Sequence, residues 1–233
     1  MNLELARFNM IEQQIRPWDV LDTSVLHLLA LVKREDFVPL AHKALAFVDM
    51  EVPLRGSMDE AQRLGQCMLA PRVEARMLQD LAVQKHETVL EVGTGSGYMA
   101  ALLGHRAQQV TTLEIDADLA QTARANLQRA GLYNVEVRTA DASKLLTGKA
   151  WDANGTDTVF DVIVLTGSVE SVPPKLLALL RIGGRLSAIV GNEPMMRATL
   201  VTRVGEAAWH TTEAWDTVVP RLLNFPEPSR FTF

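Results

Sequence analysis

The apolar positions along the chain fall into two kinds of pattern. Short apolar runs rich in β-branched residues predict buried strands; these runs are Thr88–Val92, Gln109–Glu114, Val135–Thr139, Phe160–Leu165 and Arg185–Val190. Between them, apolar residues recur every three or four positions, which predicts helices; these stretches are Pro71–Val83, Gly97–His105, Asp118–Ala130 and Pro173–Leu180. Strands that alternate with helices imply an α/β fold, in which a parallel sheet carries helices on both faces.

The two ends of the chain depart from this alternation. Near the C-terminus, Thr199–Val204 and Ala208–Val219 alternate in polarity and predict two antiparallel strands. Near the N-terminus, Asn2–Ile15 and Thr23–Val32 predict two helices that pack on the main domain, the first through a stripe that includes Leu5 and Phe8. We therefore divide the chain into an N-terminal helical extension (1–70), a sheet domain (71–223) and an extended tail (224–233).

Polar or glycine-containing segments connect the predicted elements. We expect Arg55–Arg63 to be a surface loop, Lys144–Thr158 to be a loop and Gly183–Gly184 to be a turn. In the C-terminal tail, we expect Phe231 or Phe233 to dock on the protein's own surface.

The chain is organised around the segment TVLEVGTGSGY at Thr88–Tyr98. A strand, a glycine-rich turn and a helix form a nucleotide site in α/β sheets, because glycines let a ligand approach backbone N–H groups closely. Glu114 ends the next strand, about 20 residues after Gly93, where an acidic residue can hold ribose hydroxyls. The third glycine comes one position earlier than in a dinucleotide fingerprint, which argues against an NAD-dependent oxidoreductase.

Composition narrows the class of protein. The net charge of −5 and the absence of a basic stripe disfavour a nucleic-acid binder. A single cysteine excludes an internal disulfide framework and a thiolate metal cluster, and the five histidines show no ligand spacing, so we expect no metal. Because no apolar run reaches about 18 residues, we expect no membrane span and a soluble, cytoplasmic protein.

Six phrases follow one another in the order typical of protein-L-isoaspartate O-methyltransferases. They are MIEQQIRP, VKREDFVP, AFVDMEVPL, GQCMLAP, VLEVGTGSGY and LLRIGGRLSAIVG. The chain resembles that family over nearly its whole length. The resemblance implies a Rossmann-like methyltransferase sheet with an N-terminal segment that forms part of the substrate cleft, and S-adenosyl-L-methionine as cofactor, with S-adenosyl-L-homocysteine as product.

The resemblance also assigns roles to residues at the carboxyl ends of the strands. The glycine turn passes the amino-acid part of the cofactor, Glu114 accepts both ribose hydroxyls, and Asp141 accepts the adenine amine. Outside such a family, Glu114 could be an ordinary strand-end carboxylate and Asp141 a turn residue. The full set of expected cofactor-binding residues is Glu91, Gly93, Thr94, Gly95, Ser96, Gly97, Glu114, Ile115, Asp141, Ala142 and Thr166.

The predicted acceptor loop departs from the family pattern. The family has roughly Gly-Gln-Thr-Ile-Ser-Gln-Pro, whereas this chain has Gly65-Gln66-Cys67-Met68-Leu69-Ala70-Pro71. Leu69 stands in place of the functional serine and cannot donate a hydrogen bond, and a site that loses a donor loses discrimination. Cys67 is either a reactive thiol or a small apolar filler, and Asp49 is either a cleft residue or a turn residue.

The reaction that we expect is methyl transfer to a carboxylate by in-line displacement. Such a reaction needs positioning and exclusion of water rather than a general base, and no catalytic triad is visible. Two alternatives stay open: the same cofactor and fold with a more apolar acceptor, and a non-catalytic module that binds S-adenosylmethionine. The acceptor is a protein, a peptide or a small molecule, and the protein is a monomer or a homodimer.

Overall fold

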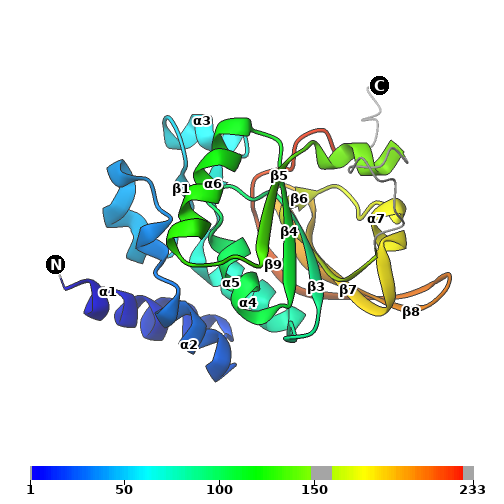
Figure 1. Ribbon diagram of the computed structural model, residues 1–233, viewed down its shortest axis with the longest axis horizontal. Helices are drawn as coiled ribbons and strands as arrows, with labels where there is room; N and C mark the ends of the chain where they lie inside the picture. Colours follow the sequence, from blue (N-terminus) through cyan, green and yellow to red (C-terminus); the bar gives the residue numbers. More distant parts are fainter. Residues whose placement is uncertain (1, 148–158, 228–233) are drawn as a thin grey trace.

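A seven-stranded sheet forms the centre of the computed structural model, which describes residues 2–147 and 159–227 (Figure 1). The strand order is β5-β4-β3-β6-β7-β8-β9. The first five strands of this order are parallel, and β8 and β9 continue the sheet in antiparallel pairing. Their bounds are β3 Thr88–Val92, β4 Gln109–Glu114, β5 Val135–Thr139, β6 Phe160–Val169, β7 Leu180–Asn192, β8 Met195–Gly205 and β9 Ala208–Thr217.

Helices cover both faces of the sheet, as the alternation of strands and helices predicts. Within β3, Val89 packs into one hydrophobic cluster and Leu90 into the other, because neighbouring side chains of a strand point to opposite faces. The first cluster contains residues of α4 (Pro71–Leu81), α5 (Tyr98–Arg106) and α6 (Ala117–Arg129). The second contains residues of the 3-10 helix Ala142–Thr147 and of α7 (Pro174–Ala178). The expected α/β fold is confirmed.

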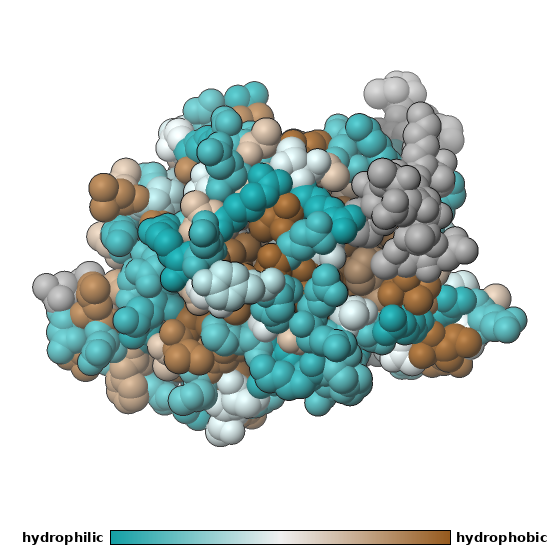
Figure 2. All heavy atoms as spheres, viewed as in Figure 1, coloured by the Kyte–Doolittle hydropathy of each residue, from teal (hydrophilic) through white to brown (hydrophobic). Residues whose placement is uncertain are grey.

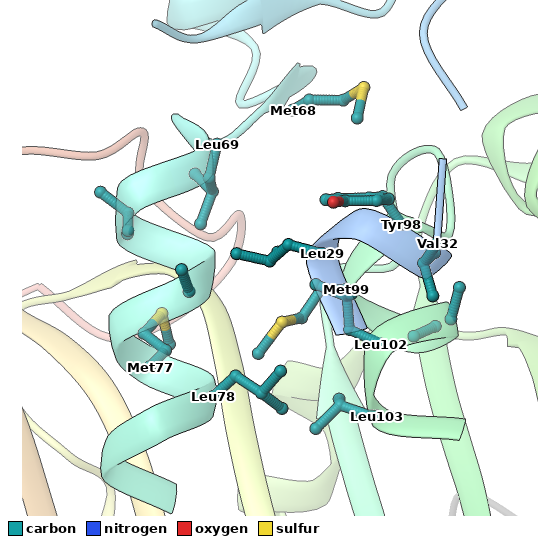
Figure 3. Close-up of a cluster of buried hydrophobic side chains, with 14 of the residues drawn as sticks. Leu29, Val32, Met68, Leu69, Met77, Leu78, Tyr98, Met99, Leu102 and Leu103 are labelled. Carbon is teal, nitrogen blue, oxygen red and sulfur yellow. The ribbon is translucent and has the colours of Figure 1, made fainter. Parts of the chain in front are cut away.

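The N-terminal extension shares the first hydrophobic cluster with the sheet helices. It contains α1 (Leu3–Met10), a π-helical turn Ile11–Ile15, α2 (Thr23–Leu31), the 3-10 helices Arg16–Trp18, Arg34–Asp36 and Leu40–Phe47, and α3 (Met58–Arg63). Figure 3 shows Leu29 of α2 between Leu78 of α4 and Tyr98 of α5. A two-stranded antiparallel ribbon, β1 (Val52–Pro53) and β2 (Cys67–Met68), links the extension to the loop before α4.

The apolar stripe of the first helix is not the one that the spacing predicts. Ile11 and Ile15 are buried, whereas Leu5 and Phe8 are 55% and 60% exposed. Two features account for the difference. The π-helical turn at Ile11–Ile15 changes the helical spacing, and buried Arg7 occupies the inward position next to Glu35. On the face drawn in Figure 2, hydrophobic patches accordingly interrupt the hydrophilic surface near the N-terminal helices.

Two of the predicted connections were wrong, and one predicted helix ends earlier than expected. Met58–Arg63 is helical, with the Ser57 hydroxyl accepting the Glu60 N–H at 3.3 Å; Ser-x-x-Glu is a readable capping signature. Gly183–Gly184 lies inside β7 and not in a turn. Glycine is needed at position 184 because a Cβ there would lie 2.8 Å from the Asp161 carbonyl oxygen of the neighbouring strand β6. The predicted helix Pro173–Leu180 is shorter, since Leu180 already belongs to β7.

The remaining segments can be compared only in part. The predicted loop Lys144–Thr158 begins inside the 3-10 helix Ala142–Thr147, and residues 148–158 lie outside the described part. Phe231 and Phe233 also lie outside it. Over residues 2–147 and 159–227, no helix is long and apolar enough to cross a membrane.

We predict that Leu78→Ala lowers the free energy of unfolding by about 2–5 kcal/mol, since its fully buried side chain would leave a cavity between α2, α4 and α5. Urea unfolding followed by circular dichroism measures this change. Leu31→Ala is the matched control: this leucine of α2 is 57% exposed, and its loss should change stability by no more than about 0.5 kcal/mol. Equal losses in the two variants would contradict the packing described here.

Candidate functional site

A cavity of about 250 Å³ opens at the carboxyl ends of the parallel strands. Its walls come from the loop Gly65–Leu69, the glycine turn after β3, the end of β4, residues 140–142 after β5, Thr166 and Gly167 of β6, and the C-terminal stretch Pro220–Phe225. In open α/β sheets, ligands bind outside this edge of the sheet. The predicted site residues on its walls are Gln66, Cys67, Leu69, Gly93, Gly95, Glu114, Ile115, Asp141, Ala142 and Thr166.

The glycine turn lets the backbone pass close to the end of β6. Gly93 has φ +98°, and a Cβ there would lie 2.9 Å from Thr166 Oγ1. The Thr166 hydroxyl donates to the Val92 carbonyl oxygen at 2.8 Å, which ties β6 to the start of the turn. Gly97 faces the other way, because a Cβ on it would contact Ala123 and Leu127 of α6. The first two glycines therefore shape the cavity, and the third lets α5 and α6 pack closely.

Glu114 fixes the turn from the end of β4. Its Oε2 accepts the Gly95 N–H at 2.8 Å and its Oε1 accepts the Asp116 N–H at 3.0 Å. The residue is only 7% exposed, and burial raises the pKa of its carboxyl against the opposing effect of these backbone donors. Each carboxylate oxygen has two lone pairs, so each keeps acceptor capacity for a ligand hydroxyl.

Asp141 also lines the cavity, after the neighbouring strand β5, and is held by two donors. Its Oδ1 accepts the Ser143 N–H at 2.9 Å, and its Oδ2 accepts from Asn224 Nδ2 at 3.0 Å. Burial raises the pKa of the Asp141 carboxyl, whereas the hydrogen bonds from these donors lower it. The donors have the larger combined effect, so the pKa is lowered from its ordinary value. The Asp141 carboxylate is therefore ionised at neutral pH and can accept from a ligand amine.

The sequence reasoning missed the C-terminal wall of the cavity. Leu222 lies over the glycine turn, within 3.1 Å of where a Cβ on Gly93 would be, and Phe225 is buried in the second hydrophobic cluster. Backbone hydrogen bonds between Ser168 and the residues Pro220 and Leu222 hold this segment against β6. A short stretch after β9 without alternating polarity gave no sequence signal for such a role.

Four predicted residues have other positions. Glu91 is fully buried, and Thr94 and Ser96 are 4% exposed and contact neighbouring strands and helices; none of the three lines the cavity. Thr94 Oγ1 and Thr112 Oγ1 share a hydrogen bond of 2.6 Å, and the Ser96 carbonyl oxygen accepts from Asn126 Nδ2. With Gly97, these residues support the turn and are not among the residues that line the cavity.

Most of the predicted acceptor loop faces the cavity. Gln66, Cys67 and Leu69 line it, and the side chains of Met68 and Leu69 both belong to the hydrophobic cluster of Figure 3. Gln66 Nε2 donates to Asp116 Oδ2 at 3.3 Å, which joins the loop to the end of β4. Burial raises the pKa of the Cys67 thiol to about 12, and nearby Glu51 adds to the rise. A thiol that is protonated at neutral pH is a poor nucleophile, which favours the filler interpretation.

Asp49 lies in a neighbouring groove of about 660 Å³. Its Oδ1 accepts the Arg72 N–H at 3.1 Å and its Oδ2 accepts from Arg72 Nη1 at 2.6 Å, and the Arg72 guanidinium is stacked over the Trp18 ring. Asp49 thus fixes the first turn of α4. The groove and the cavity share Pro220 as a lining residue, so they meet beside the loop.

Metal chemistry has no visible support in residues 2–147 and 159–227. In that part of the chain, no group of three or more histidine, cysteine, aspartate or glutamate side chains could hold a metal ion.

Comparisons with known proteins agree on one family. The sequence profile of protein-L-isoaspartate(D-aspartate) O-methyltransferase (PCMT) matches residues 6–218. The chain is 38% identical over 199 residues to a protein-L-isoaspartate O-methyltransferase of Koribacter versatilis, covering 85% of this chain and 82% of that protein. It is 35% identical over 226 residues to one of Rhodopseudomonas palustris, covering 94% of this chain and 96% of that protein.

The fold also matches a solved structure. A Plasmodium falciparum protein designated as a protein-L-isoaspartate O-methyltransferase, in complex with S-adenosyl-L-homocysteine, superposes with a TM-score of 0.74 at 18% identity. The match covers 93% of this chain and 97% of that one. At this level of identity the match shows that the two chains share a fold.

We predict that Glu91→Gln makes stability less dependent on pH. Burial raises the pKa of Glu91 from an ordinary 4.5 to about 8, and the Thr112 hydroxyl offsets part of the rise. Because the Glu91 carboxyl keeps its proton to a higher pH in the folded state than in the unfolded state, it contributes to the free energy of unfolding. This contribution is full below about pH 4.5 and is lost as pH rises through about 8. Between pH 6 and 8.5, wild-type protein should therefore lose roughly 1–3 kcal/mol more than the glutamine variant.

Urea unfolding at the two pH values measures this difference. Glu206→Gln, which changes an exposed carboxylate, is the control and should keep the wild-type pH dependence. An unchanged pH dependence in Glu91→Gln would show that the Glu91 carboxyl does not keep its proton in the folded protein.

Proposed function

The chain belongs to the protein-L-isoaspartate(D-aspartate) O-methyltransferase family, and we propose that it transfers a methyl group from S-adenosyl-L-methionine to the carboxylate of an isoaspartyl residue. The products are a methyl ester and S-adenosyl-L-homocysteine. Acceptors are proteins or peptides, and we propose that the enzyme works in the cytoplasm as a monomer or a homodimer, without nucleic acid.

One observation carries the assignment of the cofactor site: Glu114 and Asp141 place two carboxylates at the walls of the same cavity, beside the glycine turn. The spare acceptor capacity of Glu114 suits the paired hydroxyls of a ribose. Asp141, ionised and facing the cavity, suits the amine of an adenine. Gly93, Gly95 and Thr166 line the part of the cavity that is left for the amino-acid end.

The residues on the acceptor side act by positioning and by excluding water. S-adenosylmethionine supplies a methyl group that is activated by its sulfonium charge. A carboxylate acceptor is ionised at neutral pH, so no group of the protein must remove a proton. Leu69 and Cys67, whose thiol stays protonated, present an apolar wall that keeps water from the cavity.

The groove beside the cavity has room for several residues of a polypeptide. Its volume of about 660 Å³ lies within the usual range for ligand sites, and its walls include Met50, Met58 and the paired Asp49 and Arg72. An acceptor chain that lies in this groove reaches the cavity beside Pro220. The same enzyme could therefore hold a peptide backbone in the groove and the reacting carboxylate in the cavity.

A more apolar acceptor is the second candidate, and Leu69 is the observation that favours it. Leu69 is 4% exposed and is one of the residues that line the cavity, and its side chain, which packs in the first hydrophobic cluster, cannot donate a hydrogen bond to a carboxylate. An apolar acceptor would find complementary surface there, whereas an isoaspartyl peptide would depend on backbone donors of the loop.

We predict that the protein transfers labelled methyl groups to an isoaspartyl peptide but not to the matched aspartyl peptide.

Glu114→Gln should weaken binding of S-adenosylhomocysteine about ten- to a hundredfold, because a charged acceptor of two hydroxyls is lost. Calorimetry measures this binding, with Glu136→Gln, which changes an exposed carboxylate of β5, as the control. Product binding without transfer to the isoaspartyl peptide would contradict the isoaspartyl assignment and leave the cofactor site in place.

We also predict that Leu69→Ser raises kcat/KM for the isoaspartyl peptide about tenfold, the worth of one hydrogen bond to a charged group. Leu69→Ala is the matched control, because it removes the same apolar side chain without adding a hydroxyl. Steady-state kinetics on both variants separates the two effects. Equal activity of the serine and alanine variants would show that the hydroxyl has no part in acceptor recognition here.

A further inference from the structure

A buried cluster of charged and polar side chains lies beneath the acceptor loop and the glycine turn. Within the described residues, side-chain atoms of Arg34, Glu74, Glu91 and Tyr98 are buried without a hydrogen-bond partner. Arg34 and Glu91 are fully buried, Tyr98 is 1% exposed and Glu74 is 4% exposed. Burying an ionic group costs free energy unless an opposite charge and hydrogen bonds offset that cost. A cluster of such side chains therefore indicates a role besides packing.

Arg34 reaches the acceptor loop directly. It belongs to the segment VKREDFVP of the N-terminal extension, and its Nη2 donates to the Leu69 carbonyl oxygen at 2.9 Å. The preceding residues of the loop are held differently, since Cys67 and Met68 pair with β1. The Arg34 contact therefore fixes the backbone at the position where the loop leaves its ribbon and enters α4.

The same guanidinium also meets the elements that carry the cofactor turn. Arg34 Nη1 lies 3.9 Å from Glu74 Oε2 in the first turn of α4. The guanidinium carbon lies 5.6 Å from the centroid of the Tyr98 ring, which is the first residue of α5 after the glycine turn. Figure 3 shows the Tyr98 hydroxyl pointing toward the side on which Leu69 and α4 lie.

The cluster extends to Glu91 of β3. Burial raises the pKa of the Glu91 carboxyl, and the nearby Glu74 and Glu114 carboxyls add to the rise. Arg34 is the cation that offsets the buried Glu74 carboxyl. A planar guanidinium can hold a carbonyl and a carboxylate together in fixed directions, which an ammonium cannot do. Arg34 thus joins the acceptor loop and the cofactor turn through one buried group.

We propose that Arg34 is a positioning residue for the acceptor: it holds the Leu69 backbone in register with the glycine turn, although it touches neither substrate. The proposal rests on the function proposed above only where it concerns the acceptor. The geometry of the loop itself does not depend on which acceptor is methylated.

Two measurements on Arg34→Met test this role in the full-length protein. Hydrogen exchange with saturating S-adenosylhomocysteine should show the amides of residues 66–70 exchanging about tenfold faster than in wild type. KM for the isoaspartyl peptide should rise about tenfold, while kcat and the affinity for S-adenosylhomocysteine change less than about twofold. Arg34→Lys should restore part of the slow loop exchange and part of the low KM. Its ammonium group can bind the Leu69 carbonyl or the Glu74 carboxylate, but it lacks the planar guanidinium that binds both in fixed directions.

Arg7→Met is the matched control. Arg7 is also a buried arginine of the N-terminal extension, and it pairs with Glu35, the residue next to Arg34. Its loss should lower stability without changing loop exchange or KM. Equal effects of Arg7→Met and Arg34→Met on the loop would overturn the proposal, as would an equal loss of product affinity and acceptor affinity in Arg34→Met.

Two further arms keep the test decisive. If Arg34→Met does not fold, Arg34→Gln, which keeps a donor but loses the charge and the reach, is measured in the same way, with faster loop exchange expected and unchanged exchange overturning the proposal. If wild-type protein shows no turnover on the isoaspartyl peptide, the proposed function fails, and loop exchange alone still decides the role of Arg34.

Discussion

The hydrogen bond from the Gly95 N–H to the Glu114 carboxylate is the interaction on which the site depends. It joins the turn after β3 to the end of the neighbouring strand β4, so that two segments far apart in sequence form one wall. Because Glu114 also accepts the Asp116 N–H, the same carboxylate sets the start of α6. The carboxylate that a ribose would need is thus the one that builds the cavity, and its position is fixed before any ligand binds.

The predicted acceptor loop is held by a different kind of contact. Its loop lies on a segment that belongs to the N-terminal extension, and it is tied to the sheet by side chains instead of by strand pairing. Arg55 pairs with Asp116 at 2.9 Å, Gln66 donates to the same carboxylate, and Arg34 holds Leu69 from below. The predicted acceptor loop therefore depends on separate side-chain contacts, whereas the glycine turn depends on backbone donors to Glu114.

The parts that could be predicted are those encoded in short stretches of sequence. The strand Thr88–Val92, the glycines and the carboxylate of Glu114 follow from local patterns, and their positions at one sheet edge follow from parallel topology. The wall formed by Leu222, Leu223 and Phe225 could not be predicted, because it depends on where the chain returns after β9. The exposure of Phe8 was missed since a π-helical turn and a buried ion pair override the helical stripe. Gly184 was misread because a close approach of two strands and a turn both require glycine.

Glu91 shows how function and stability are joined in the same motif. The local pattern suggested a ligand contact, yet Glu91 is fully buried, does not line the cavity and lies near Glu74. Burial raises the pKa of both Glu74 and Glu91 to about 8, so these groups oppose the folded state most strongly in alkaline solution. Both groups therefore lower the stability of the folded protein in alkaline solution, and Arg34, which offsets Glu74, also donates to the backbone of the predicted acceptor loop. The loop and the first residue of α5 after the turn share this one guanidinium, so its removal takes a contact from each of them.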